Sequence, residues 1–85
     1  MSLEELKESK SFVVGTKQTT RAIAEGQAKK VFLALDADRF LQIEIEKQCR
    51  ENHVLLESVP TMMELGKWAG IEVKAAVATI LDEQQ

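Results

Sequence analysis

The sequence feature that most limits the possible folds is an uninterrupted apolar run, Val31–Leu35, with two lysines before it and an aspartate after it. A strand with one solvated face alternates apolar and polar residues, whereas a run that is apolar at every position suits a strand covered on both faces. Such strands are typical of the centre of an α/β sheet. Because shorter apolar runs alternate with segments of helical spacing around it, the sequence predicts a three-layer α/β/α sandwich with a four-stranded mixed sheet.

Helices and strands are predicted to alternate along the whole chain, beginning with a helix and ending with a strand. Ser2 and Glu5 are spaced as a capping box and start the first, short helix. Apolar and β-branched runs predict four strands, at residues 12–14, 31–35, 54–59 and 75–81. Helical spacing predicts three further helices, at residues 16–25, 39–52 and 61–70.

Residues 39–52 fit two patterns, and the neighbouring segments decide between them. Leu41, Ile43 and Ile45 alternate with polar residues as in a strand, whereas Leu41, Ile45 and Cys49 recur at helical spacing. We choose a helix because the segment is about four turns long and a new apolar run follows it, as in a β-α-β crossover.

Three polar residues are placed to cap these helices. Thr16 and Asp38 each precede a helical pattern and are predicted as N-caps. Thr61 and Glu64 have the spacing of a capping box. Asp36 and Asp38 could instead bind Mg²⁺, but two carboxylates without a third ligand favour the cap.

The segment from Gly15 to Arg21 breaks a local electrostatic rule. Acidic side chains are preferred in the first turn of a helix because exposed N–H groups and the macrodipole make that end positive. Here the first turn carries Lys17 and Gln18, and the first acid is Glu25. Free N–H donors, two cations and an amide around a glycine suit an anion. A solvated helix face explains the same residues equally well.

Length and composition limit the kind of protein. The 85 residues suffice for one small domain, residues 1–85. No apolar run reaches the roughly 18 to 20 residues of a membrane helix, and no signal-peptide pattern opens the chain, so we expect a soluble, cytoplasmic protein without a membrane partner. The single cysteine, Cys49, is expected to be a buried thiol, and the single histidine, His53, to lie at a surface turn.

Charge is distributed unevenly along the chain, whose formal net charge is -3. Residues 1–30 carry six bases and four acids, whereas residues 31–85 carry five bases and ten acids. The first part is therefore +2 and the second -5. An anion-binding face is expected to be compact and to draw on the amino-terminal third.

Four motifs, in order along the chain, resemble those of one protein family. They are Gly15–Arg21, Gly26–Lys29, Asp36–Asp38 and Leu65–Val73. Over nearly its whole length the sequence is similar to the kink-turn-binding ribosomal protein family, in its small bacterial branch. The resemblance implies an α/β/α sandwich that binds kink-turn RNA, a sharply bent internal loop with tandem sheared G·A pairs and one extruded nucleotide.

The resemblance also implies a set of RNA-binding residues. Gly15 and Thr16 would lie against the RNA, the polar residues after them would reach guanine edges, and Asp38 would contact the extruded base beside the apolar loop at 71–74. The complete implied set is Gly15, Thr16, Lys17, Gln18, Arg21, Lys29, Asp38, Ile71, Glu72, Val73 and Lys74.

The sequence departs from the family pattern at several positions. Arg39 replaces a proline that starts the helix, Met62 stands where many members have lysine, and Lys74 replaces a small residue. Lys17 and Gln18 stand where members outside the small bacterial branch usually have asparagine and glutamate. Met62 is expected to lower the attraction for phosphate, and Lys74 to restore part of it.

These observations predict a non-catalytic, monomeric RNA-binding protein whose partner is structured RNA with a kink-turn, in ribosomal RNA or a riboswitch-like RNA. No cofactor, metal or catalytic residue is expected, because one histidine, one cysteine and no tyrosine leave little for an active site. The alternative is a ribosome-associated or protein-interaction adaptor on the same scaffold, with an apolar patch around Met62, Met63 and Trp68. Partial packing of these side chains into the core is the simpler expectation.

Overall fold

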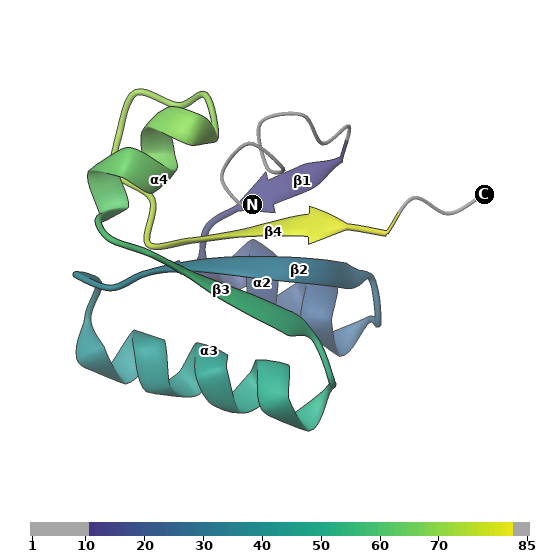
Figure 1. Ribbon diagram of the computed structural model, residues 1–85. Helices are drawn as coiled ribbons and strands as arrows, with labels where there is room; N and C mark the ends of the chain where they lie inside the picture. Colours follow the sequence, from purple (N-terminus) through teal and green to yellow (C-terminus); the bar gives the residue numbers. More distant parts are fainter. Residues whose placement is uncertain (1–10, 83–85) are drawn as a thin grey trace.

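The computed structural model describes residues 11–82, in which strands and helices alternate as predicted (Figure 1). The strands are β1 (Phe12–Val14), β2 (Ala28–Ala34), β3 (Leu55–Val59) and β4 (Val77–Leu81). The helices are α2 (Thr16–Ala24), α3 (Arg39–Glu51) and α4 (Met62–Trp68). The helix predicted after Ser2 lies outside the described residues.

The four strands form one mixed sheet in the order β1-β4-β2-β3. β2 and β3 are parallel and are joined through α3, which confirms the predicted crossover. β4 lies between β1 and β2 and is antiparallel to both. Thr79 of β4 lies opposite Val13 of β1 on one side and opposite Val31 of β2 on the other. The predicted four-stranded mixed sheet is therefore confirmed.

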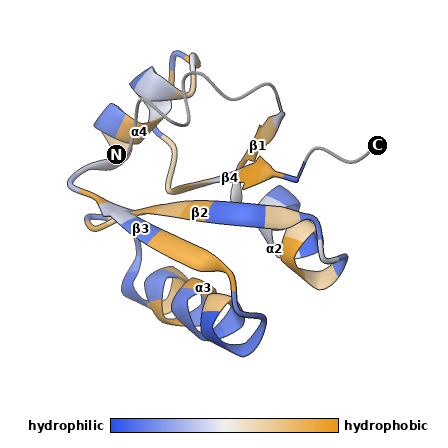
Figure 2. Ribbon diagram, turned by 45° about the vertical axis from the view of Figure 1, so that its right-hand side comes forward, coloured by the Kyte–Doolittle hydropathy of each residue, from blue (hydrophilic) through white to orange (hydrophobic). Residues whose placement is uncertain are grey.

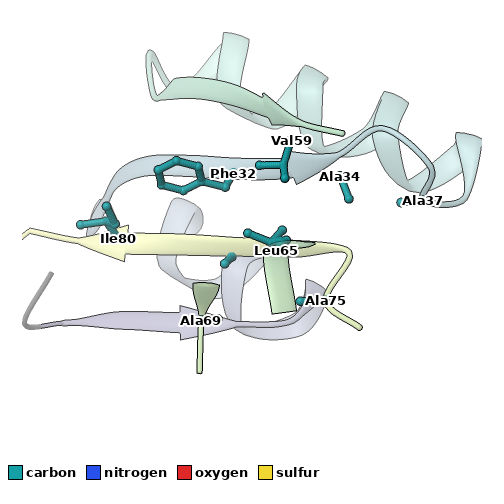
Figure 3. Packing of buried hydrophobic residues seen from close by; sticks show 9 residues of the cluster. Phe32, Ala34, Ala37, Val59, Leu65, Ala69, Ala75 and Ile80 are labelled. Carbon is teal, nitrogen blue, oxygen red and sulfur yellow. The ribbon is translucent and has the colours of Figure 1, made fainter. Parts of the chain in front are cut away.

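The sheet is covered on both faces, as the central apolar run predicts. Val31 and Leu33 point toward a buried cluster with α2 and α3, where Ile23, Ile45 and Cys49 lie. The alternate residues of β2 point to the opposite face and pack against α4; Figure 3 shows Phe32 and Ala34 in that cluster. Successive side chains of a strand point to opposite faces of the sheet. Because helices cover both faces of β2, its side chains must be apolar at every position in this part of the strand. The α/β/α sandwich is confirmed.

β2 differs from the prediction at both ends. It begins at Ala28, three residues earlier than predicted. The lysines after Ala28 can belong to the strand because the backbone of this segment pairs with β4 and because Lys30 has a side-chain partner. Lys30 Nζ lies 2.8 Å from Glu57 Oε1 of β3. Figure 2 shows a hydrophilic stretch near the start of β2 and a hydrophobic remainder. The prediction that Leu35 belongs to the strand is wrong, since Leu35 lies in the following turn and is 52% exposed.

The helix prediction for residues 39–52 is confirmed, with α3 ending one residue earlier, at Glu51. Ile45 and Cys49 are buried, and His53 lies exposed in the turn that follows, as expected. Ile43 produced the strand-like alternation in the sequence, but it is half exposed on the outer side of the helix. The strand-like alternation of apolar and polar residues in the sequence therefore comes from an exposed isoleucine on a helix, and not from the buried face of a strand.

The last strand and two of the predicted caps differ from expectation. β4 begins at Val77 because the Ala75 N–H donates to the Met62 carbonyl at 3.0 Å, which holds residue 75 against α4. Thr16 is not an N-cap: Gly15 occupies that position. Asp38 holds the N-cap position of α3, but its side chain makes no capping hydrogen bond.

The third predicted cap is confirmed. The Glu64 N–H donates to Thr61 Oγ1 at 3.1 Å, which satisfies one of the free donors at the start of α4. α4 spans Met62–Trp68, inside the predicted range of 61–70.

A buried pair of threonines connects α2 to the sheet. Thr19 of α2 and Thr79 of β4 are both fully buried, and the Thr79 hydroxyl donates to Thr19 Oγ1 at 2.8 Å. A hydroxyl buried without a partner costs free energy, so each threonine needs the other. This bond fixes α2, and the turn before it, relative to β4.

We expect Thr19→Val to lower the free energy of unfolding by about 1 to 3 kcal/mol, because it removes the acceptor of the buried Thr79 hydroxyl. The double variant Thr19→Val/Thr79→Val should regain most of the loss, since both polar groups are then absent. Urea denaturation of the wild type, both single variants and the double variant measures this coupling. Additive losses would show that the two hydroxyls do not depend on each other.

Candidate functional site

Four chain segments meet at one edge of the sheet, formed by the ends of β1, β2 and β3 and the start of β4; we call it the carboxyl edge (left in Figure 1). The Gly15 N–H donates to the Val77 carbonyl at 2.9 Å, and the Ala34 N–H donates to the Ala76 carbonyl at 2.9 Å. These bonds join the β1–α2 turn to the first residue of β4, and the end of β2 to the residue before it. Segments far apart in the sequence thus form one surface.

The β1–α2 turn requires glycine at position 15. Gly15 has φ 114 and ψ 157, a backbone conformation that side-chain-bearing residues rarely adopt. A Cβ there would also lie 2.8 Å from Gln18 Oε1, so the Gln18 side chain folds back over the turn. The Gly15 carbonyl accepts from the Thr19 N–H at 3.0 Å and starts the helix. This turn therefore presents bare backbone next to the first polar side chains of α2.

The polar side chains of the first turns of α2 form a small hollow of about 250 Å³, lined by Lys17, Gln18 and Arg21. All three residues are exposed, as is Thr16. Arg21 Nε lies 3.8 Å from Glu25 Oε2, with 80% of the Arg21 side chain exposed. Because exposed pairs of this kind hold the side chain only weakly, Arg21 stays available to an incoming anion or base.

The loop between α4 and β4 contributes the apolar part of the site. Val73 is 70% exposed and Ile71 is half-buried. Together with Glu72, Lys74 and two residues of α4 they line an open hollow of about 420 Å³. The loop therefore offers apolar surface beside a lysine and a glutamate.

Gly66 holds this loop in place and was missed by sequence reasoning. A Cβ at Gly66 would collide with the Val73 carbonyl oxygen, and the Ile71 N–H donates to the Gly66 carbonyl at 3.1 Å. The loop backbone thus packs directly on α4, and only glycine permits that approach. The spacing of Gly66 and Gly70 was the available signal, but by itself it has little meaning outside membrane helices.

The turn between β2 and α3 is fastened from several sides. Gln42 is buried, and its side-chain amide donates to the Leu35 carbonyl at 3.1 Å and to the Ala37 carbonyl at 2.8 Å. Asp36 Oδ1 accepts from the Met62 N–H at 2.8 Å, which ties the turn to α4. Asp38 follows with an exposed side chain. Asp36 thus has a structural partner, and Asp38 faces solvent at the carboxyl edge.

The structure brings most of the sequence-predicted residues together and leaves one apart. Three segments lie at the carboxyl edge: the α2 start at 15–21, Asp38, and the loop at 71–74. Lys29 lies in the second position of β2, at the opposite end of the sheet, where Ala28 pairs with Leu81. Sequence order alone could not separate Lys29 from the others.

The patch predicted around two methionines and a tryptophan is partly packed against the core. Met62 and Trp68 pack against the buried cluster on the α4 side of the sheet, as expected. Met63 is 70% exposed and lines the hollow beside Val73. The apolar surface of α4 is therefore continuous with the loop site.

Cys49, the single cysteine, is buried in the layer between α3 and the sheet. Burial raises the pKa of the Cys49 thiol to about 11, so the nucleophilic thiolate is scarce at neutral pH. No group of three or more metal-ligating side chains occurs in residues 11–82. Within the same range, no helix combines the length and apolar character needed to cross a membrane.

The sequence matches the model of one known protein family over nearly its whole length. The family model described as "Ribosomal protein L7Ae/L30e/S12e/Gadd45 family" matches residues 2–85. The chain belongs to this family. The predicted resemblance is confirmed.

Relatives within the L7Ae/L30e/S12e/Gadd45 family cover nearly the whole chain. An "RNA-binding protein" of Bacillus pumilus (strain SAFR-032) is 37% identical over 81 residues, which are 95% of this chain and 99% of the relative. "RNA-binding protein YbxF" of Geobacillus stearothermophilus is 40% identical over the same shares of both chains. A solved structure, a protein with unknown function from Bacillus halodurans C, has a TM-score of 0.82, with 21% identity over 94% of this chain and 80% of that one, which supports the fold alone.

We expect Gly66→Ala to destabilise the protein, although alanine normally stabilises a helix interior by about 0.5 to 1 kcal/mol relative to glycine. The collision with the Val73 carbonyl should outweigh this gain and cost about 1 to 3 kcal/mol. Thermal denaturation measures the change, with the neighbouring exposed position Lys67→Ala as the control. A more stable Gly66→Ala variant would mean that the loop does not rest on α4.

Proposed function

We propose that this protein is a non-catalytic RNA-binding protein that recognises kink-turns and stabilises the bent RNA. The observation that carries the proposal is the meeting of the α2 start, Asp38 and the 71–74 loop at the carboxyl edge. Each segment offers a different chemistry, namely cationic and amide groups, a carboxylate, and apolar surface. A regular A-form helix presents a deep, narrow groove that side chains cannot read, whereas a kinked internal loop exposes base edges and unstacked bases.

The first turns of α2 fit the guanine edges of sheared G·A pairs. Arginine and lysine donate to guanine O6 and N7, which are acceptors, and the Gln18 amide can donate or accept. Lys17, Gln18 and Arg21 all line one hollow, so they can address neighbouring bases together. The bare backbone at Gly15 lets the RNA approach the start of the helix.

The carboxylate and the apolar loop fit the remaining parts of a kink-turn. Asp38 is exposed and can accept hydrogen bonds from the N–H groups of an extruded base. The exposed Val73 and the half-buried Ile71 offer apolar contact to unstacked bases, while Lys74 adds a cation for phosphate. The relatives named as RNA-binding proteins support an RNA partner.

The small number of cations at this edge sets the expected salt dependence. Each phosphate contact contributes a slope of about -0.7 to -0.9 in a plot of log affinity against log salt concentration. Lys17, Arg21 and Lys74 are the cations among the proposed contacts, so the slope should be modest. Affinity is then expected to come mainly from base contacts. Because Lys29 lies at the other end of the sheet, we propose a compact interface that does not include it.

We expect Arg21→Ala to weaken binding of a kink-turn duplex by about 1 to 3 kcal/mol, the range for a lost guanine contact. Arg50→Ala is the matched control, because Arg50 is exposed in the last turn of α3, away from the carboxyl edge. Titration of both variants with the same RNA compares their dissociation constants. Equal losses would indicate general charge attraction instead of guanine reading by α2.

We expect Val73→Asp to weaken kink-turn binding by at least about 1 kcal/mol, because it places a carboxylate beside phosphates and an apolar base face. Since Val73 is 70% exposed, the melting temperature should hardly change. Leu55→Asp is the control, because it introduces the same carboxylate at another exposed apolar residue. Leu55 is the first residue of β3 and lies at the opposite end of the sheet. Unimpaired binding by the Val73 variant would exclude the loop from the interface.

A further inference from the structure

A large aromatic side chain is exposed beside the proposed interface. Phe40, in the first turn of α3, is 81% exposed, and Leu35, in the turn before it, is 52% exposed. Both flank Asp38 at the carboxyl edge. A phenylalanine left in water forgoes the free energy that burial of its ring would provide, which marks Phe40 as a candidate contact residue.

The exposure of Phe40 is built into a well-anchored part of the fold. The two hydrogen bonds of the Gln42 amide attach the first turn of α3 to the backbone of Leu35 and Ala37. The Leu35 N–H also donates to the Val59 carbonyl at 2.8 Å. The backbone beneath this apolar surface is therefore preorganised, and a partner that bound there would not have to order the turn.

The exposed cations of the carboxyl edge suit an anionic partner that carries rings. Glu44, one turn beyond Phe40 on α3, accepts from the Gln48 amide at 2.9 Å. α2 and α3 contact each other and both begin at the carboxyl edge, so Arg39 joins Lys17 and Arg21 as an exposed cation there. Of the two acids in the turn, Asp36 accepts from the Met62 N–H. Asp38 is the remaining acceptor, and every nucleobase with an N–H edge can donate to such a carboxylate.

We infer that Phe40 is a stacking platform for the extruded nucleobase of the bound RNA, with Leu35 extending the apolar surface and Arg39 near the phosphate. This inference rests on the proposed function and adds a residue that contacts the face of the base by stacking. Stacking on an aromatic ring suits any base, because each base has a π-face, so this contact fixes the position of the nucleotide without selecting its identity. Asp38 then supplies the hydrogen-bonding side of the same nucleotide's site.

The test is a binding titration of Phe40→Ala and Phe40→Tyr with a kink-turn duplex, and with the same duplex carrying an abasic extruded nucleotide. Phe40→Ala should weaken binding of the intact duplex roughly 5- to 160-fold, the range for one lost base–aromatic stack, whereas Phe40→Tyr should stay within about twofold. The abasic duplex should bind wild type and Phe40→Ala alike, because the stacking partner is absent. Leu55→Ala, another exposed apolar residue, should leave both affinities unchanged.

The outcomes separate the two proposals. If the wild type prefers kinked over fully paired RNA but Phe40→Ala binds the intact duplex as tightly as the wild type, the stacking inference is wrong and the Phe40 surface belongs to another partner, such as a protein. The inference is also wrong if Phe40→Ala weakens binding of intact and abasic duplexes equally. If the wild type does not distinguish kinked from fully paired RNA, the proposed function fails and the stacking inference fails with it.

Discussion

The two-sided burial of β2 is the constraint on which the rest of the structure depends. Val31 and Leu33 need one apolar layer and Phe32 and Ala34 need another, so helices must cover both faces of the sheet. Parallel pairing of β2 with β3 requires a crossover, and α3 supplies it on one face. α4 closes the other face, and the turns that follow β1, β2 and β3, together with the loop before β4, lie at the carboxyl edge.

The candidate site follows from this arrangement and from two glycines. Gly15 gives the β1–α2 turn its conformation, and Gly66 lets the loop before β4 rest on α4. The buried Gln42 amide fixes the third segment, between β2 and α3. Three segments with little regular structure are therefore held by backbone contacts and buried polar groups, which leaves their exposed side chains free for a partner.

The order of strands and helices could be predicted from the sequence, because it depends on local periodicity and on breakers. The end of β2 could not, since Leu35 is apolar but its position is set by the turn that Gln42 holds. The separation of Lys29 from the site depends on strand direction, which motif order does not reveal. Gly66 and Gln42 were missed for a related reason: their roles are contacts with distant backbone, and a single sequence records only residue types.

The central claim is that one RNA contacts the three segments of the carboxyl edge at once. Amide chemical shifts of the isotope-labelled protein, measured during titration with a kink-turn duplex and with the same duplex whose G·A pairs are made Watson–Crick, test it most directly. We predict shift changes at residues 15–21, at 35–40 and at 71–74 with the kinked RNA alone, and unchanged shifts around Lys29 and Leu55. Changes centred on Lys29 and Leu55, or the same changes with both RNAs, would contradict the claim.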